Sequence, residues 1–355
     1  MVMDIRVIGT GGASGWPEPG CRCASCLRAA RETPRTPSAI VVGGVLRLGL
    51  DGPADGTDGY AADEYGTGEC AADGYLVRET PGGWDVTAPD GARLLYQPRP
   101  GRAEGGPYDV AFVDVLGDPF LLGALRASGQ VTDDTVVLAA CADHRARSGA
   151  ELERLCGFWR VGLVGDGDSV TSVSYEKKKT FRVLVLGGAR SGKSERAEQR
   201  VAADASVTYV ATGPTGTGDA EWAARVAAHQ RRRPPWWRTV ETTDLSEVLA
   251  HAEGTVLIDG IGTWLASVMD ECEAWTGCTA AVEERVADLV RAWRQTSGYV
   301  VAVSDETGLG VVPPTPAGRL FRDWLGRVNQ ALAVESEEAE LVVAGRVIPL
   351  DGPFR

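Results

Sequence analysis

The residues with the clearest potential for chemistry form one glycine-rich stretch in the middle of the chain. The stretch consists of Gly187, Gly188, Ala189, Arg190, Ser191, Gly192, Lys193 and Ser194. Its spacing fits G-x-x-x-x-G-K-[ST], a pattern in which backbone N–H groups surround the phosphates of a nucleotide. The pattern predicts that Lys193 reaches the terminal phosphates and that the Ser194 hydroxyl binds Mg²⁺.

The sequence on both sides of this stretch suits the prediction. Residues 181–186, FRVLVL, are an apolar run typical of a buried parallel strand. Residues 195–203 are rich in good helix formers. A strand, a glycine turn and a helix in this order direct backbone N–H groups and a helix N-terminus toward a phosphate.

The rest of this half alternates strand and helix patterns. Strands are expected at 207–211, 255–258, 299–304 and 341–344, and helices at 220–232, 281–293 and 319–332. The alternation predicts an α/β fold of the P-loop NTPase type, a parallel sheet with helices on both faces. Asp259 ends one strand, where an acid beside a phosphate loop commonly helps to hold Mg²⁺.

His229 is a second candidate for chemistry. It is followed by Gln230, three arginines and Pro234, so an anion beside it would be stabilised. Neighbouring cations also favour the neutral form of an imidazole. A neutral imidazole can attack phosphorus and form a covalent intermediate. The alternative interpretation is an ordinary surface histidine.

Composition restricts the classes of partner. The length of 355 residues suggests two domains. A net charge of −13 argues against nucleic acid and anionic membranes as partners. No apolar run approaches the length of a membrane span, and the opening residues are too acidic for a signal peptide. We therefore expect a cytoplasmic protein.

Cysteines near the start of the chain suggest a metal site. Cys21, Cys23 and Cys26 are three of eight cysteines in a chain without an export signal, which favours a shared metal over disulfides. Tetrahedral zinc needs a fourth ligand. His144 is a candidate, because it follows a strand-like run at 135–140. The alternative is three free thiols on a loop.

The N-terminal half resembles the phosphodiesterase branch of the metallo-β-lactamase fold. The resemblance rests on the opening IGTGGASGWP, the C-x-C-x-x-C that follows, and Asp51-Gly52-Pro53. It implies a structural zinc held by the three cysteines and a late histidine, here His144. The H-x-x-H pair of that branch reads Cys141 to His144 in this chain, so Cys141 replaces a catalytic ligand.

The catalytic metal motif of that fold, H-x-H-x-D-H, does not occur in the sequence. Residues 55–74 lie where it would fall and contain no histidine. We therefore expect residues 1–172 to be a shortened, non-catalytic α+β domain with a structural or regulatory role. A charged linker at 173–180 would join it to a second domain at 181–355.

Residues 181–355 resemble the bifunctional adenosylcobinamide kinase / adenosylcobinamide-phosphate guanylyltransferase family of cobalamin biosynthesis. The matching segments are the loop GGARSGKSERAE, YVAT at 209–212, Asp219 to Arg225, His229 with Arg233-Pro234, WRTVE at 237–241, Asp259 with Trp264-Leu265, residues 304–313, and Arg319 to Gln330.

The resemblance implies two reactions and a set of partners. A nucleoside triphosphate, ATP or GTP, would phosphorylate adenosylcobinamide. GTP would then transfer GMP through His229 to give adenosylcobinamide-GDP. It also implies a nucleotide contact for Glu241 and a homo-oligomer, expected as a trimer.

The sequence departs from the family pattern near the phosphate loop. Asp305 stands where the family usually has Asn, and Gly260 and Gly262 replace its usual Cys and Thr. Asp305 adds a negative charge near the expected nucleotide site, so it is expected to alter the affinity of the chain for a nucleotide. Three other functions stay open at this point: a P-loop kinase or ATPase for another metabolite, a zinc hydrolase, and a nucleotide sensor without chemistry.

Overall fold

The computed structural model describes residues 3–32, 34–55, 69–170, 181–213, 224, 226–227 and 230–350. The chain divides into two compact units, Met1–Glu176 with Ala202–Ala205, and Lys177–Val201 with Ser206–Arg355. None of the described helices is both long enough and apolar enough to cross a membrane.

The first unit contains two sheets and three helices within the described residues. The first sheet has the order β11-β1-β2-β3-β4, and the second has the order β10-β9-β8-β7-β6-β5. The elements are β1 (Ile5–Gly9), α1 (Ala24–Ala29), β2 (Ala39–Val42), β3 (Leu46–Gly49), β4 (Gly52–Asp55), β5 (Glu69–Ala72), β6 (Tyr75–Thr80), β7 (Gly83–Thr87), β8 (Arg93–Gln97), β9 (Val110–Val113), α2 (Pro119–Ala127), β10 (Val136–Ala139), α3 (Gly149–Trp159) and β11 (Ser169–Val170).

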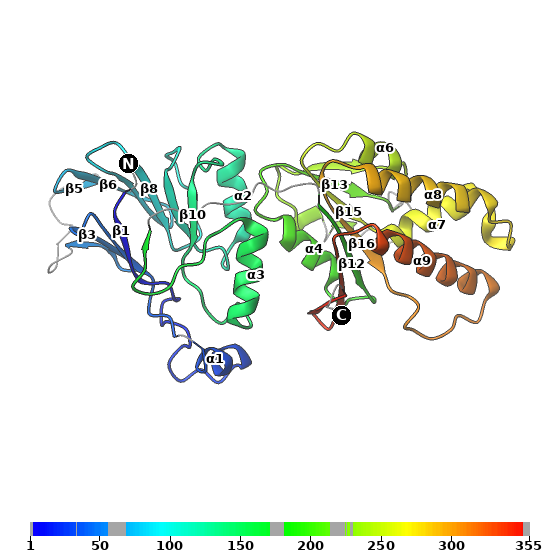
Figure 1. The fold of residues 1–355 in the computed structure, drawn as a ribbon, viewed down its shortest axis with the longest axis horizontal. Coiled ribbons are helices and arrows are strands. Elements are labelled where there is room, and N and C mark those ends of the chain that lie inside the picture. The colour runs from blue at the N-terminus through cyan, green and yellow to red at the C-terminus, as the bar shows by residue number, and fades with distance from the viewer. Residues whose placement is uncertain are drawn as a thin grey trace. The chain divides into compact units, whose positions relative to one another are not determined.

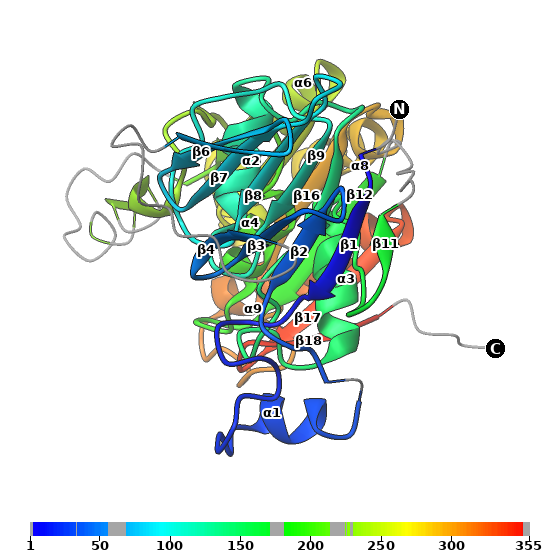
Figure 2. The same ribbon diagram turned by 90° about the vertical axis from the view of Figure 1, so that its left-hand side faces the viewer.

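Alternating side chains place the second sheet between two apolar layers. Leu94 packs toward the first sheet, where Ile5 and Leu48 are fully buried. The next residue, Leu95, points to the opposite face and packs with Trp159 of α3, because successive strand residues face opposite sides. Figure 1 shows α2 and α3 beside this sheet, and Figure 2 shows β1 and β2 side by side in the first sheet.

The second unit is built on one sheet with the order β14-β13-β15-β16-β12-β17-β18, parallel except for β18. Its elements are β12 (Phe181–Gly187), α4 (Lys193–Val201), β13 (Val207–Ala211), β14 (Arg238–Glu241), α6 (Leu245–Ala250), β15 (Thr255–Asp259), α7 (Ile261–Glu271), the 3₁₀ turn η1 (Ala274–Thr276), α8 (Ala280–Gln295), β16 (Tyr299–Asp305), α9 (Pro316–Val334), β17 (Glu338–Val343) and β18 (Arg346–Pro349).

Helices cover both faces of this sheet, as the sequence predicts. Figure 1 shows α4 on one side and α7, α8 and α9 on the other. Leu184 of β12 faces the larger apolar core, in which Trp264, Trp293 and Leu325 are buried. The parallel sheet confirms the α/β prediction for this half. The helix expected at 220–232 lies mostly outside the described residues.

One predicted element boundary differs from the structure. The last parallel strand begins at Glu338, three residues before the expected start, because its first residues include the charged Glu338 and Glu340.

Asn329 of α9 is a polar residue that is buried. Its Oδ1 accepts a hydrogen bond from Ser304 Oγ at 2.6 Å, which joins α9 to β16.

A buried ion-pair network fixes α4 to the sheet. Arg196 donates two hydrogen bonds to the Glu340 carboxylate at 3.0 and 2.9 Å, and Arg200 donates to the same carboxylate at 2.8 Å. All three side chains are at most 6% exposed. Burial raises the pKa of Glu340, but the hydrogen bonds from Arg196 and the charge of Arg200 outweigh this effect and hold its pKa below the ordinary value of 4.5.

We expect Glu340→Gln to lower the free energy of unfolding of this unit by about 3 kcal/mol near neutral pH, because two buried arginines lose the carboxylate that they share, while Arg200 keeps its ion pair with Glu338. A carboxylate with a lowered pKa stabilises the folded state above its ordinary pKa of 4.5 and loses that contribution as the pH falls. The difference between wild type and variant should therefore narrow in acid. Denaturant unfolding between pH 3 and 7 measures it.

Asp288→Asn is the matched control, since Asp288 pairs with Arg291 at 2.7 Å on an exposed face of α8. Its effect should stay near 0.5 kcal/mol. Equal losses in the two variants would show that the buried network does not anchor α4.

Candidate functional site

The predicted phosphate loop joins β12 to α4 at the carboxyl end of the sheet. Gly187 ends the strand, and a Cβ there would collide with Ser191 Oγ and with the carbonyl oxygen of Val342. Gly192 has a φ of +95°, a conformation that favours glycine. The carbonyl oxygen of Ser191 accepts a hydrogen bond from Gly345 N at 2.8 Å, so β17 and its turn support the loop.

Lys193 begins α4 and is already paired. Its Nζ lies 2.8 Å from Asp305 Oδ1 and donates to the carbonyl oxygen of Gly188 at 3.2 Å. Asp305 ends β16, and its backbone is opposite Gly187 in the parallel register of β12 and β16. The predicted phosphate-binding lysine therefore has an acidic partner at the edge of the loop.

Ser194 and Asp259, the predicted magnesium ligands, lie together. Ser194 Oγ donates to Asp259 Oδ1 at 3.2 Å. The second oxygen of Asp259 accepts a hydrogen bond from the Tyr209 hydroxyl. Burial raises the pKa of Tyr209, and the Asp259 charge raises it further, so the phenol stays protonated and donates.

The backbone turn after Asp259 requires a glycine at position 260. Gly260 has a φ of +113°, and a Cβ there would collide with Thr263 Oγ1. Thr212 Oγ1 donates to the carbonyl oxygen of Gly260 at 2.6 Å and also contacts Thr263 Oγ1 at 2.6 Å. The strained turn is thus held by two threonine hydroxyls, and a Cys at this position would need a different backbone.

Two further residues are predicted for this half, His229 and Glu241. His229 lies outside the described residues. Nearby, Arg233 Cζ lies 3.7 Å from the centre of the Tyr209 ring, so the segment after His229 approaches the Asp259 cluster. Glu241 is exposed at the carboxyl end of the edge strand β14.

The three predicted zinc-binding cysteines form a cluster in the first unit. The Sγ atoms of Cys21, Cys23 and Cys26 all lie within 4.8 Å of one another. Cys23 caps α1 by accepting a hydrogen bond from Cys26 N at 3.4 Å, and this contact lowers the pKa of the Cys23 thiol. Burial raises the pKa of Cys26 to about 11. Three thiols at this spacing suit a tetrahedral metal.

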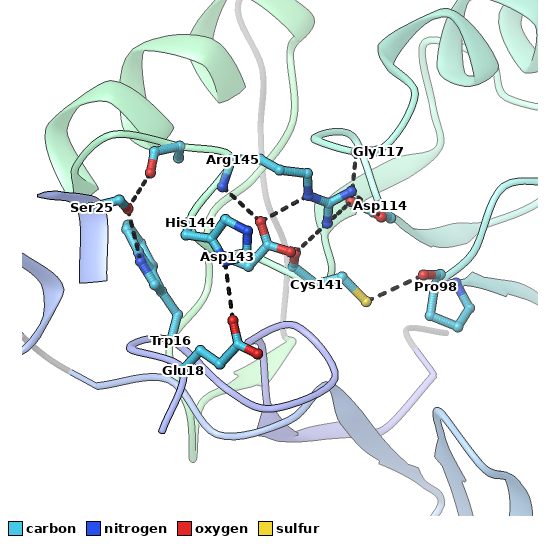
Figure 3. Close-up of polar contacts among 11 residues, drawn as sticks. Trp16, Glu18, Ser25, Pro98, Asp114, Gly117, Cys141, Asp143, His144 and Arg145 are labelled. Atoms are coloured by element: carbon cyan, nitrogen blue, oxygen red, sulfur yellow. Dashed lines mark hydrogen bonds and ion pairs between the residues drawn. The ribbon is translucent and has the colours of Figure 1, made fainter. Parts of the chain in front are cut away.

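His144 does not join the cysteine cluster in this structure. Its Nδ1 lies 3.5 Å from Glu18 Oε2, and its side chain is 48% exposed (Figure 3). The backbone oxygen of Glu18 accepts a hydrogen bond from Cys21 N at 3.1 Å, so Glu18 connects the histidine with the cysteine turn. The zinc set predicted from the sequence is therefore brought together for its three cysteines only.

Cys141, which replaces a catalytic ligand in the resemblance, is buried at the end of β10. Figure 3 shows its thiol directed to the carbonyl oxygen of Pro98, to which it donates at 3.4 Å. Beside it, Arg145 donates to both carboxylate oxygens of Asp114 at 2.9 and 3.0 Å and to Asp143 at 2.8 Å. Burial raises the pKa of Cys141 to about 12. The thiol stays protonated at neutral pH.

Sequence reasoning missed Tyr209 and Thr212 as partners of the site. Both occur in the YVAT segment, whose apolar residues predict a strand but indicate no contact with Asp259. Their positions at the end of β13, beside β15, could have suggested contact with Asp259, because parallel strands end at the same edge of a sheet.

A glycine loop between a central parallel strand and a helix, with an acid at the end of a nearby strand, defines a P-loop α/β protein. Residues 183–350 match the family described as "Cobinamide kinase / cobinamide phosphate guanyltransferase". Over 182 residues, the chain is 39% identical to the bifunctional adenosylcobalamin biosynthesis protein CobP of Pseudomonas aeruginosa, covering 48% of this chain and 98% of that protein.

Two further relatives carry the name bifunctional adenosylcobalamin biosynthesis protein CobU. The Escherichia coli (strain K12) protein is 36% identical over 176 residues, covering 46% of this chain and 96% of that protein. The Salmonella typhimurium protein is 35% identical over 175 residues, with the same two shares. The chain therefore belongs to the cobinamide kinase / cobinamide phosphate guanyltransferase family, which confirms the family predicted for its C-terminal half.

We expect Lys193→Ala to weaken binding of a nucleoside triphosphate at least tenfold, because a charged hydrogen bond to phosphate is worth about 1.5–3 kcal/mol. Calorimetric titration with a non-hydrolysable ATP analogue measures the loss. The melting temperature should change little, since the lysine contacts the loop and not the core. Unchanged affinity would mean that the loop does not bind the phosphates.

Proposed function

We propose that residues 181–355 catalyse both steps named in the family description. In the first, a nucleoside triphosphate phosphorylates the hydroxyl of adenosylcobinamide. In the second, GMP passes from GTP to the phosphorylated product and gives adenosylcobinamide-GDP. The observation that carries the proposal is the contact of Ser194 with Asp259 directly behind the phosphate loop, because it joins the two parts that phosphoryl transfer needs.

In the kinase step, the chain would bind and orient the triphosphate. Backbone N–H groups of the phosphate loop and the Lys193 ammonium would bind the phosphates. Ser194 and Asp259 offer the oxygen donors that Mg²⁺ prefers, so the donor set fits that ion. When bound, Mg²⁺ would neutralise phosphate charge. The Tyr209 hydroxyl holds the second oxygen of Asp259 and so orients the carboxylate.

In the transfer step, His229 would act as the nucleophile. An imidazole nitrogen forms a bond to the α-phosphorus of GTP, and the bond to pyrophosphate breaks. The phosphate oxygen of the cobinamide then displaces the histidine. Arg233, four residues after His229 in the sequence, contacts the ring of Tyr209, whose hydroxyl donates to Asp259, and this supports the proposed role.

The proposal includes three small-molecule partners, adenosylcobinamide, ATP and GTP, with Glu241 as a nucleotide contact. It also includes a homo-oligomer, expected as a trimer from the family resemblance. A kinase for another small metabolite is the second candidate, favoured by the departure at Asp305, which pairs with the phosphate-loop lysine.

His229→Ala should abolish transfer of GMP and leave phosphorylation of adenosylcobinamide largely intact, because only the second step uses the covalent intermediate. Incubation with α-labelled GTP should leave label on the wild-type protein that survives base and is lost in mild acid, as a phosphoramidate behaves. His251→Ala is the control. His251 is exposed, and its Nδ1 lies 3.0 Å from the carbonyl oxygen of Glu247, so that variant should be labelled normally. Label on a residue other than His229 would refute the assignment.

We propose that the first unit is a metallo-β-lactamase-like domain without hydrolase activity. Two observations at the ends of β9 and β10 support this. Arg145 donates to both carboxylate oxygens of Asp114, and the buried Cys141 thiol donates to Pro98, so neither Asp114 nor Cys141 is available to bind a catalytic metal. Cys21, Cys23 and Cys26 would hold a structural zinc, and we keep His144 as the proposed fourth ligand. Such a zinc contributes directly to folding stability.

Metal analysis of the purified chain should find about one zinc per chain. Cys23→Ser should lower both the zinc content and the melting temperature of the first unit, since a thiolate ligand is lost. Phosphorylation of adenosylcobinamide per folded molecule should stay near the wild-type rate. Cys278→Ser, at an exposed cysteine outside the cluster, should keep the zinc. Two or more tightly bound metals, or phosphodiesterase activity that a chelator removes, would overturn the proposal.

A further inference from the structure

The structure pairs the phosphate-loop lysine with a carboxylate that the family pattern does not have. Asp305 Oδ1 lies 2.8 Å from Lys193 Nζ. The lysine side chain is only 14% exposed, whereas the Asp305 side chain is 41% exposed. A nucleotide that uses Lys193 must therefore separate this ion pair or share the lysine with Asp305.

The backbone of Asp305 is held in place from two sides. Asn329 Nδ2 donates to the Asp305 carbonyl oxygen at 3.0 Å, and the buried Asn329 is itself fixed by Ser304. The next amide, Glu306 N, donates to the carbonyl oxygen of Gly187 at 3.1 Å. These hydrogen bonds oppose a shift of β16, so a rotation of its side chain is the easier way for the carboxylate to leave the lysine.

Gly262 makes room for that carboxylate. A Cβ at Gly262 would lie 3.1 Å from Asp305 Oδ2, which is tighter than an ordinary contact. The two departures from the family pattern, Asp305 and Gly262, are thus neighbours in space. A larger side chain at 262 would push the carboxylate away from its present position.

We propose that Asp305 makes the nucleotide site selective for magnesium-bound over metal-free nucleotide. The inference rests on the proposed nucleotide binding by the phosphate loop. Without nucleotide, Asp305 neutralises Lys193. When phosphates take the lysine, the released carboxylate faces their negative charge, and this repulsion disfavours binding. Mg²⁺ bound to the phosphates would reduce their net negative charge, so the magnesium–nucleotide complex is repelled much less by Asp305.

Asp305→Asn tests the inference with almost no change of shape. The dissociation constant of the non-hydrolysable analogue β,γ-imido-ATP is measured by calorimetry on the full-length chain, once with excess Mg²⁺ and once with EDTA. The variant should bind the metal-free analogue about tenfold more tightly than wild type, because the repulsion between the Asp305 carboxylate and the uncompensated phosphate charge is removed. Binding of the magnesium complex should change less than about threefold, so the preference for magnesium shrinks.

Two further variants separate this effect from a general change in charge or fold. Glu284→Gln removes one exposed acidic group from α8 and should keep the wild-type preference for magnesium. Gly262→Ala crowds the carboxylate and should shift the preference in the same direction as Asp305→Asn, by a smaller factor.

An unchanged magnesium preference in Asp305→Asn would overturn the inference. So would a loss of affinity confined to the magnesium complex, because Asp305 would then be a ligand of the metal. If wild type binds the analogue under neither condition, the proposed nucleotide binding fails, and the role of Asp305 fails with it. The first two results leave nucleotide binding intact, so the two failures are distinguishable.

Discussion

The shape of the phosphate loop depends on how α4 is fixed to the sheet. The helix has few apolar residues, and its inner face carries the charged Arg196 and Arg200. Burying two guanidinium groups would destabilise the fold strongly unless each found a counter-charge. Glu340 of β17 supplies one carboxylate for both, so the helix start, and with it the loop amides, are held at a defined place at the end of β12.

Two other candidate functional residues lie at the same carboxyl edge of the sheet. Asp259 and Asp305 end β15 and β16, and each contacts one residue of the phosphate loop, Ser194 and Lys193. The turn glycines then take on separate roles. Gly260 supplies a backbone conformation that other residues rarely adopt, and Gly262 leaves space for the Asp305 carboxylate. Asp305 and Gly262, two of the departures from the family pattern, therefore lie next to each other in the structure.

The sequence predicts local features of this chain well and distant contacts less well. The strand, loop and helix around Lys193 follow from a short pattern with strict steric demands, and the position of Asp259 follows from the end of an apolar run. The pairing of Lys193 with Asp305 and the burial of Asn329 depend on how β16 and α9 pack, which periodicity does not reveal. The same limit applies to His144. Spacing predicts the cysteine cluster, because its three members lie within six consecutive residues. His144 follows a strand that is distant in the sequence, and it contacts Glu18.

The central claim is that the C-terminal half of this chain first phosphorylates adenosylcobinamide and then transfers GMP to the phosphorylated product. Mass spectrometry of adenosylcobinamide incubated with the purified chain, Mg²⁺ and ATP, and then with GTP added, tests it most directly. The account predicts a phosphorylated cobinamide with ATP alone, converted to adenosylcobinamide-GDP once GTP is present. Unmodified adenosylcobinamide, in a reaction where the nucleoside triphosphates are hydrolysed, would contradict the account.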